Sequence, residues 1–537
     1  MVKNIQKWVD ARTYSPETLA FARVVLEEIS IGREPFRAVR AHPLPQGGYV
    51  PKHALIACYY DLVARGEWQP EPALLERLRM KPMRSLSGVT TVTVLTKPHP
   101  CPGQCIFCPD DARMPKSYLP DEPGAARAFQ NQFDPYLQVR SRLDSYTATA
   151  HPIDKIELLI LGGTWSAYPR EYQETYIRRC FDAMNGFDSL TLEEAQAANE
   201  NATSHNVGLV IETRPDEITP ELLAWLRRLG VTKVQMGAQS MDDHILARNL
   251  RGHTAADTTS ACALLRAAGF KIVLHWMPNL LGSTLESDRL DFARLWEDCA
   301  PDEIKIYPTQ LLEGTGLYRK WQSGEYQPYT TEELIDLIAG LKPGIPPYCR
   351  VNRIIRDIPS PHIVAGNKRS SLRQDVLAEL ARRGQTCGCI RCHEVGQGVV
   401  LPENLRLEDH TYPASGAEEH FLNFRTPGGK IAAYLRLSLP GASEASTQIM
   451  SAIPELASCA MVREVHVYGQ VQRIGSGQEG AAQHVGLGTR LLEEAARIAL
   501  ASGFHKLAVI SAIGTRKYYE ARGFKRSDLY MIREINP

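Results

Sequence analysis

The sequence predicts two α/β domains joined by a cysteine-rich connection. Short apolar, β-branched runs alternate with amphipathic helical stretches through the first two thirds of the 537 residues, as in parallel strands connected by helices. Between about residues 341 and 410 the chain becomes rich in Pro, Gly, Arg and Cys, which is typical of a linker stapled by a metal. We therefore expect a parallel α/β array, either a doubly wound sheet or a partial barrel, followed by a smaller α/β domain.

Six strands are expected in the first array. They are "VTTVTVLT" (89–96), "KIELLILGG" (155–163), "VGLVIETRPD" (207–216), "VTKVQMGAQS" (231–240), "KIVLHWMPNL" (271–280) and "DEIKIYPTQ" (302–310). Stretches such as "TPELLAWLRRLG" and "TAADTTSACALLRAAGF" supply helices between them. Active sites of parallel α/β folds lie at the carboxyl ends of the strands. The polar or special residues gathered there are Gly162, Glu212, Arg214, Gln239, His275 and Tyr307.

Four segments follow from these patterns: a helical, basic segment (1–84), the parallel array (85–340), a basic linker with a metal site (341–410) and the second α/β domain (411–537). In the last segment, "GKIAAYLRLSL", "VREVHVYGQV" and "HKLAVISAIG" are expected strands, and "GTRLLEEAARIALASG" is an expected helix. Residues 1–84 carry 13 Lys and Arg against 9 Asp and Glu, and residues 341–384 carry 9 against 3. Such local excess suits an anionic partner, although the whole chain is formally neutral.

Composition indicates a cytoplasmic protein without membrane spans. No run of about 18 apolar residues occurs, and the first residues lack the apolar stretch of a secretory signal. Twelve cysteines are too sparse for a disulfide scaffold, and six of them fall in two clusters. This clustering predicts metal ligands in a reducing compartment.

The first cluster, "CPGQCIFCPD", contains Cys101, Cys105 and Cys108 in a C-x3-C-x2-C pattern just after the first expected strand. Structural zinc normally takes four protein ligands, whereas an iron–sulfur cubane held by three cysteines keeps one iron open for another molecule. Three cysteines therefore favour the cubane. A zinc loop with a distant fourth ligand is the alternative.

This cysteine pattern resembles the radical S-adenosylmethionine (radical SAM) superfamily, with Phe107 as the aromatic residue before the last cysteine. "LILGGTW", at the end of the second expected strand, is similar to that superfamily's glycine motif. The resemblance implies a 4Fe-4S cluster and SAM binding by Phe107 and by Gly162, Gly163 and Thr164. Glu212, Arg214 and Gln239 are further candidates for SAM or substrate. A core salt bridge between Glu212 and Arg214 is the alternative, and His275 also fits a buried core histidine.

The second domain contains "QHVGLGTRLLEEA" (483–495), a glycine turn that opens into a helix. Such a turn presents backbone N–H groups and the positive end of the helix to a pyrophosphate. Together with "REVHVYG" before it and "YYEARGF" after it, the turn resembles the GNAT acetyltransferase fold. That resemblance implies acetyl-CoA binding, with Tyr518 or Tyr519 near the thioester sulfur in a catalytic position. The expected acetyl-CoA residues are Glu464, His466, Gln483, His484, Val485, Gly486, Leu487, Gly488, Thr489, Tyr518 and Tyr519.

A radical SAM domain followed by a GNAT domain resembles the family of the Elongator catalytic subunit. "KPHPCPGQCIFCP", "FDPYLQVRSRLD", "RNLRGHT", "KIYPTQLLEGTGLY" and "GTRKYYEARGF" are all similar to that family. The short gap between the first two cysteines resembles a bacterial form, which implies action without the other Elongator subunits. The resemblance also implies a carboxymethyl-type modification of carbon 5 of the tRNA wobble uridine. In that reaction, a radical derived from SAM takes hydrogen from the methyl group of acetyl-CoA.

tRNA binding requires basic side chains for phosphates and for the splayed bases of the anticodon loop. The candidate contacts near the barrel mouth or between the two domains are Lys155, Lys305, Tyr318, Arg350, Arg353, Arg356, Lys368 and Arg369.

The second cluster, "CGCIRCH", offers Cys387, Cys389 and Cys392, with His393 adjacent. This spacing suits a structural zinc whose fourth ligand is His393, Cys349 or another histidine. A second redox cluster and free thiols are the alternatives.

Two other functions are compatible with the sequence. One is a protein lysine acetyltransferase with a structural iron–sulfur domain, in which Glu464 is the general base. The other is a tRNA-binding scaffold with vestigial cofactor sites. The complete cysteine triplet, the glycine motif and the pyrophosphate turn argue against both.

Overall fold

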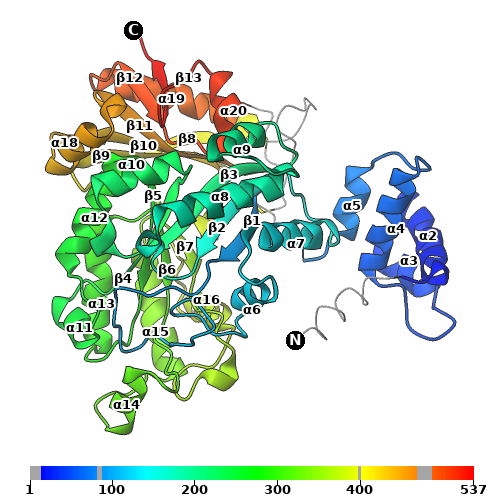
Figure 1. Cartoon of the computed structure of the whole chain (residues 1–537), viewed down its shortest axis with the longest axis horizontal. Helices are drawn as coiled ribbons and strands as arrows, with labels where there is room; N and C mark the ends of the chain where they lie inside the picture. The colour runs from blue at the N-terminus through cyan, green and yellow to red at the C-terminus, as the bar shows by residue number, and fades with distance from the viewer. Residues whose placement is uncertain (1–13, 82–87, 397–400, 469–485, 537) are drawn as a thin grey trace.

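The computed structural model describes residues 14–81, 88–396, 401–468 and 486–536. Four helices at the amino end form a unit with its own apolar core that stands apart from the rest of the chain (Figure 1). They are α2 (Pro16–Ser30), α3 (Pro35–Ala41), α4 (Lys52–Ala64) and α5 (Pro72–Leu78). No helix in the described ranges combines the length and apolar character needed to cross a bilayer.

The first sheet has seven parallel strands in sequential order, from β1 at one edge to β7 at the other. Because these edges do not pair, the sheet is an open, partial (β/α) barrel, and the predicted fold class is confirmed. Its strands are β1 (Thr90–Leu95), β2 (Lys155–Leu161), β3 (His205–Thr213), β4 (Lys233–Gln239), β5 (Lys271–Trp276), β6 (Glu303–Ile306) and β7 (Arg350–Arg353).

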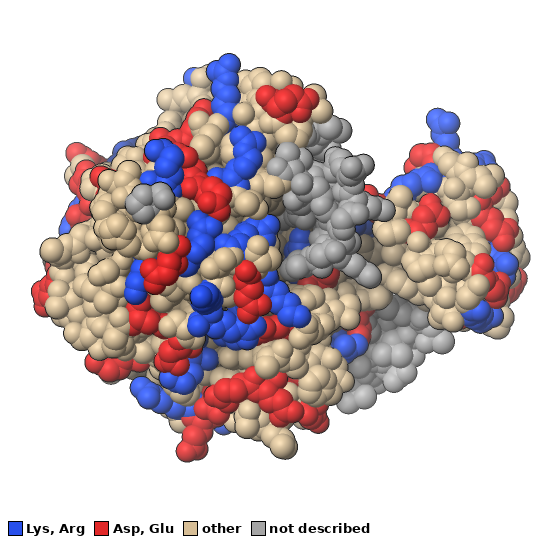
Figure 2. All heavy atoms as spheres, turned by 90° about the horizontal axis from the view of Figure 1, so that it is seen from above, with Lys and Arg blue, Asp and Glu red and all other residues tan. Residues whose placement is uncertain are grey.

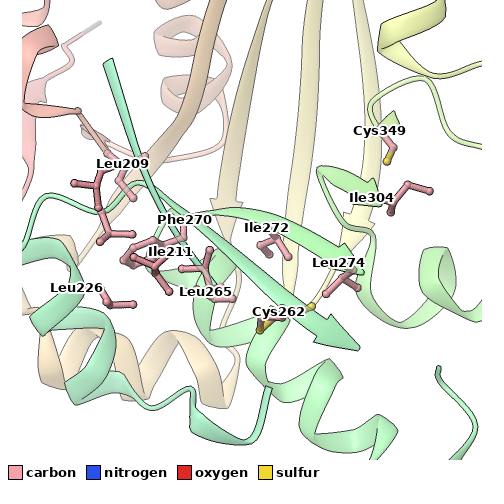
Figure 3. Close-up of a cluster of buried hydrophobic side chains, with 14 of the residues drawn as sticks. Leu209, Ile211, Leu226, Cys262, Leu265, Phe270, Ile272, Leu274, Ile304 and Cys349 are labelled. Carbon is pink, nitrogen blue, oxygen red and sulfur yellow. The ribbon is translucent and has the colours of Figure 1, made fainter. Parts of the chain in front are cut away.

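The helices of this domain mostly cover the outside of the sheet, whereas α14 lies away from it and packs against the cysteine loop (Figure 1). They are α6 (Pro123–Gln130), α7 (Pro135–Thr147), α8 (Arg170–Asn185), α9 (Leu192–Asn199), α10 (Pro220–Arg228), α11 (Asp243–Arg248), α12 (Ala255–Ala267), α13 (Leu285–Arg294), α14 (Gly316–Gln322), α15 (Thr331–Leu341), α16 (Leu372–Arg382) and α17 (Ile390–His393). α12 illustrates the local signals: Thr254 and Asp257 form a capping box, and Gly269, with a φ of 79°, follows its end. Figure 3 shows the core between sheet and helices, where Leu226 and Leu265 pack beneath Ile211 and Ile272.

β7 was not among the six expected strands. It lies in the segment 341–410 that was expected to be a linker, so the barrel sheet extends beyond residue 340. Its four residues, "RVNR", have only one apolar member, Val351, and this short polar run gave no strand signal.

The second sheet contains β8 (Arg406–Ala414), β9 (Ala417–Arg425), β10 (Ile431–Pro440), β11 (Cys459–Val467), β12 (Lys506–Val509), β13 (Lys525–Arg526) and β14 (Met531–Glu534). Its order is β13-β14-β12-β11-β10-β9-β8, and only β11 and β12 pair in parallel. Its helices are α18 (Glu444–Ala452), α19 (Leu487–Ala501) and α20 (Arg516–Glu520).

The second sheet packs against the amino ends of the barrel strands. Tyr530 donates from its hydroxyl to the carbonyl of Ala268, 2.5 Å away. Lys271, the first residue of β5, pairs with Glu464 of β11 at 2.5 Å. In Figure 1 this sheet lies above the barrel, at the far end from α14. The cysteine loop, which follows the carboxyl end of β1, is therefore at the opposite end of the barrel.

Candidate active site

The loop between β1 and α6 brings Cys101, Cys105 and Cys108 to the carboxyl end of the barrel, where all three are partly exposed. The Cys101 Sγ lies 3.5 Å from the Thr164 Oγ1, just after β2. The cysteine loop and the glycine motif, which are about sixty residues apart in the chain, are thus neighbours in space.

The donor set of this loop is three thiols, which suits an iron–sulfur cubane that keeps one iron open. Within the described ranges, Cys387, Cys389 and Cys392 are the group of three whose ligand atoms all lie within 4.8 Å of one another. The sulfurs of the 101–108 loop are more widely separated than that. Desolvation raises the pKa of the Cys108 thiol to about 12. These residues fit a 4Fe-4S cluster.

Both glycines of the motif adopt backbone conformations that favour glycine, and Gly162 also has no room for a side chain. Gly162 has a φ of 138°, and a Cβ there would lie 1.9 Å from the Thr96 Oγ1 at the end of β1. Gly163 has a φ of 93°, and a Cβ there would meet the Lys116 carbonyl oxygen at 3.5 Å. Gly162 is therefore required for both conformation and close packing, whereas Gly163 is required for its backbone conformation alone.

Buried polar atoms without partners surround the cysteine loop. Arg214 is buried and binds Asp216 through two nitrogens, yet its Nη1 has no partner among the described residues. The Gln239 Oε1 is likewise unpaired, and Gln239 has a φ of 68° at the end of β4. Such orphaned groups fit a polar ligand such as SAM. The alternative of a salt bridge between Glu212 and Arg214 is wrong, because Asp216 is the acidic partner of Arg214.

Glu212 faces the barrel interior. It accepts a hydrogen bond from the Tyr118 hydroxyl at 3.0 Å and lies 3.6 Å from the His275 Nδ1. His275 is buried, with its Nε2 3.3 Å from the Gln235 Oε1. Burial holds the pKa of His275 well below its usual range, so the ring is neutral. It matches the buried core histidine considered from the sequence.

The second sheet opens between β11 and β12. The two strands pair only from Cys459 to Val462 of β11, whereas β11 continues to pair with β10 as far as Val467. A bulge at Arg463 marks the point of separation. Beyond it, β11 has no second neighbouring strand among the described residues, which leaves a gap between β11 and β12 in that part of the structure.

α19 begins beside this gap. Gly486, with a φ of 69°, precedes it, and no side chain in the described part of the chain caps the helix start. Leu487 and Gly488 are buried, and the Thr489 Oγ1 accepts a hydrogen bond from the Arg522 Nε at 3.0 Å. A Cβ at Gly488 would lie 2.3 Å from the Tyr518 hydroxyl oxygen. Gln483, His484 and Val485 lie outside the described residues.

Tyr518 and Tyr519 pack edge to face, with ring centroids 5.2 Å apart. Tyr518 also lies under the guanidinium of Arg522, 3.6 Å from ring centroid to carbon. Burial raises the pKa of both hydroxyls, so both tyrosines are neutral donors at physiological pH.

Both carboxylate oxygens of Glu464 have partners. It pairs with Lys271 at 2.5 Å and with the Arg436 Nε at 2.9 Å, and it accepts from the Tyr434 hydroxyl at 2.8 Å. Burial would raise the pKa of this carboxyl, but Lys271 and Arg436 hold it well below its usual value. His466, stacked on Tyr434, is half-buried, and desolvation lowers its pKa to about 4.

One cavity of about 1410 Å³ runs through the interior of the barrel. Alternate residues of each strand line it, such as Thr91 and Thr93 of β1 and Glu157 and Leu159 of β2. At the carboxyl end it is bordered by Phe107, Cys108, Glu212 and Gln239. At the amino end it is bordered by Glu464, His466 and Tyr519 of the second sheet.

The candidate tRNA residues fall in four places. Arg350, Arg353, Arg356 and Lys305 line the cavity. Lys368 and Arg369 are exposed after η6 (Ser360–His362), and Tyr318 lies on α14 beside Trp321. Lys155, however, is the first residue of β2, so it lies at the amino end of the barrel rather than near the mouth expected from the sequence. Figure 2 shows basic and acidic side chains interspersed over one face, with basic ones gathered near its centre.

The second cysteine cluster is compact. Cys387 and Cys392 flank Cys389, and S–H hydrogen bonds to its sulfur keep the pKa of Cys389 below that of an ordinary thiol. His393 does not belong to this group: its Nδ1 lies 3.2 Å from the Cys389 carbonyl oxygen within the same helical turn. The ligand role expected for His393 is therefore not supported, because successive helical residues point in different directions.

Arg251 is a site residue that sequence reasoning missed. Its Nη1 donates to the Cys105 Sγ at 3.3 Å. It belongs to "RNLRGHT", a stretch that was noted as similar to a family but given no role. Arg251 lies in the connection that follows β4, and the connections at the carboxyl ends of parallel strands meet at one edge of the sheet. That position could have indicated that Arg251 lies near the cysteine loop.

Comparison with known proteins identifies close relatives. Residues 99–295 match the Radical SAM superfamily, and residues 301–382 match the Radical_SAM C-terminal domain. The chain is 41% identical to a tRNA uridine(34) acetyltransferase of Methanocaldococcus infernus, over 86% of this chain and 88% of that protein. It is 37% identical to Elongator complex protein 3 of Danio rerio, over 88% and 89%. The solved structure of archaeal Elp3 from M. infernus, with residues 1–46 deleted, matches with a TM-score of 0.71 at 36% identity, over 83% of this chain and 99% of that one.

Proposed function

We propose, from the premise that this chain belongs to the family of tRNA uridine(34) acetyltransferases and Elongator complex protein 3, that it modifies the wobble uridine of tRNA. SAM and acetyl-CoA are the proposed co-substrates, and a carboxymethyl-type group on carbon 5 of the base is the proposed product.

The observation that carries this proposal is the shared cavity. Cys108 of the cysteine loop and Tyr519 of the second sheet line the same 1410 Å³ space. Two independent enzymes would have no need of a common interior, whereas a reaction that joins an acetyl-derived carbon to a base needs both reactants in one water-poor space. A flipped uridine and the acetyl end of acetyl-CoA are therefore the proposed occupants.

At the carboxyl end, Cys101, Cys105 and Cys108 would hold a 4Fe-4S cluster. With SAM, such a cluster supplies a carbon radical that abstracts hydrogen. The chain's own part is to orient SAM: Gly162 and Gly163 let backbone approach closely, and the unpaired atoms of Arg214 and Gln239 offer a donor and an acceptor.

At the amino end, the uncapped start of α19 suits the pyrophosphate of acetyl-CoA, and the gap between β11 and β12 suits its pantetheine arm. Of Tyr518 and Tyr519, Tyr519 lines the cavity, so it is the tyrosine that would lie near the thioester. Its neutral hydroxyl can donate a hydrogen bond there and cannot act as a base at neutral pH.

The alternative of a protein lysine acetyltransferase is disfavoured by Glu464. A general base must accept a proton near neutral pH. Glu464 is held ionised by Lys271 and Arg436, which also occupy its oxygens. We therefore assign Glu464 to the contact between the two domains rather than to proton transfer.

For tRNA, we propose that Arg353 and Arg356, which line the cavity, and the exposed Lys368 and Arg369 contact the anticodon stem-loop. Charge reversal of Lys368 together with Arg369 should weaken binding of every tRNA and flatten its salt dependence. Reversal of Arg382, which is paired with Glu379, is the matched control and should change neither. We also propose that Cys387, Cys389 and Cys392 hold a structural zinc.

The deciding experiment is anaerobic. Reconstituted protein receives reductant, SAM, tRNA and acetyl-CoA with a deuterated methyl group, and nucleosides and 5′-deoxyadenosine are analysed by mass. Deuterium in 5′-deoxyadenosine together with a carboxymethyl-type uridine is the expected result. Acetylated peptides without SAM cleavage would refute the proposal.

A further inference from the structure

The segment "RNLRGHT" (248–254) connects α11 to α12 and lies against the cysteine loop. The Ile106 N–H, next to Cys105, donates to the Asn249 carbonyl oxygen at 3.2 Å. The Asn249 side chain, in turn, donates to the carbonyls of Ile245 and Leu281. The backbone of the cysteine loop is therefore fastened to this segment, which is itself fixed to the barrel.

Arg251 reaches from this segment to the thiol. It is 7% exposed. Its Nη1 lies 3.3 Å from the Cys105 Sγ, and its Nη2 donates to the Gly237 carbonyl in β4 at 2.5 Å. The Arg214 Nη2 donates to the Arg251 carbonyl at 2.9 Å, which fixes the backbone of Arg251. The guanidinium is thus held rigidly between the sheet and one cluster cysteine.

The position has an electrostatic consequence. A charged donor hydrogen bond is stronger in a buried setting than in water. The reduction potential of an iron–sulfur cluster depends on hydrogen bonds to its sulfurs and on local charge. Adding one electron makes the cluster and its thiolates more negative. A buried guanidinium that donates to one thiolate therefore favours the reduced form.

We propose that Arg251 is a positioning residue that donates to the Cys105 thiolate and raises the reduction potential of the cluster, so that one electron from an external reductant enters it more readily. This inference rests on the proposed function, because it requires a cluster on the three cysteines. It goes beyond that function by giving the "RNLRGHT" segment a role that neither SAM nor acetyl-CoA nor tRNA binding requires.

The test uses the full chain with its cluster reconstituted, without tRNA or acetyl-CoA. Wild type, Arg251→Gln, Arg251→Lys and Arg248→Gln are titrated with dithionite and followed by electron paramagnetic resonance. Arg248 is the matched control, because it is an exposed arginine three residues away in the same segment. Iron content and circular dichroism are measured on every sample.

Arg251→Gln is expected to lower the ratio of reduced to oxidised cluster about tenfold at a fixed potential, which is a shift of about 59 mV for one electron. Arg251→Lys keeps the charge and one donor, so it should stay within about threefold of wild type. Arg248→Gln should match wild type. A fully loaded Arg251→Gln protein with an unchanged potential would overturn the inference and leave Arg251 a purely structural residue.

Two further outcomes are also decisive. If Arg251→Gln takes up too little iron to titrate, the Arg251→Lys variant decides the question. A reduction potential close to that of wild type supports the donor role. A tenfold change in the ratio of reduced to oxidised cluster, or a protein without a cluster, refutes it. If wild type itself forms no cluster, the proposed function fails and this inference fails with it. An intact wild-type cluster with unaltered Arg251→Gln behaviour overturns the inference alone.

Discussion

Asp302 is expected to be the residue on which docking of the two domains depends most. It lies just before β6, is fully buried, and receives both terminal nitrogens of Arg463 at 2.6–3.1 Å. Arg436, also buried, approaches it at 3.3 Å. Both arginines belong to the second sheet, so Asp302→Asn would leave two buried guanidinium groups without their main counter-charge.

The expected cost follows from this geometry. Removing one partner of a buried ion pair typically costs about 3–5 kcal/mol, much of it from the charge left uncompensated. We expect Asp302→Asn to lower the free energy of unfolding by that amount. The combined variant Asp302→Leu, Arg463→Met should cost less than Asp302→Asn, because it removes Asp302 together with one of its two arginines and restores apolar contact, while Arg436 keeps its pair with Glu464.

Urea unfolding, followed by far-UV circular dichroism and by tryptophan fluorescence, measures this effect. All seven tryptophans precede residue 322, so fluorescence reports on the first domains and circular dichroism on the whole chain. The two transitions should separate in Asp302→Asn, with circular dichroism changing first. Asp144→Asn, which breaks an exposed pair with Arg140 at 2.8 Å, is the control and should cost at most about 0.5 kcal/mol. An Asp302→Asn cost equal to the control would refute the reasoning.

Three other predictions concern separate parts of the molecule. Gly488→Ala should weaken acetyl-CoA binding about tenfold in calorimetry, because the added Cβ would lie 2.3 Å from the Tyr518 hydroxyl oxygen. Adding Tyr518→Phe should restore part of the lost affinity. Equal weakening in the single and double variants would contradict this contact. Cys389→Ser should abolish zinc binding in metal analysis and leave iron content unchanged; retained zinc would exclude the compact cysteine group as the site. Burial raises the pKa of Asp288 to about 6, above its ordinary 3.8, so the protonated carboxyl stabilises the fold and this stability is lost as pH rises through 6. Between pH 5 and 7, wild type should lose about 1 kcal/mol more unfolding free energy than Asp288→Asn in urea titrations, and parallel pH profiles would disprove the shift.

Local signals account for what was predicted correctly about the fold. The six apolar runs became β1 to β6 because buried parallel strands need continuous apolar, β-branched residues whatever they pack against. The sequence of β8 indicates a strand less clearly, because β8 is an edge strand whose residues are mostly exposed and need not be apolar. It also contains Pro413.

The candidate site was predictable only where its residues are close in sequence. Cys101, Cys105 and Cys108 share one loop, and Gly162 with Gly163 forms one turn, so spacing alone indicates their chemistry. The partners of charged residues could not be read this way. Arg214 was considered with Glu212, two residues before it, but its strand-end geometry turns it toward Asp216.

The sequence by itself determined the parallel array, the cysteine loop at a strand end and the glycine turn before α19, because each depends on contacts within a few residues. Only the tertiary structure decided that Lys271 neutralises Glu464, 193 positions away, and that Arg251 reaches Cys105 across 146 positions. It also decided that both candidate sites open into one cavity. Such pairings depend on which strand ends meet and on how one sheet docks against another, and residue periodicity carries no information about either.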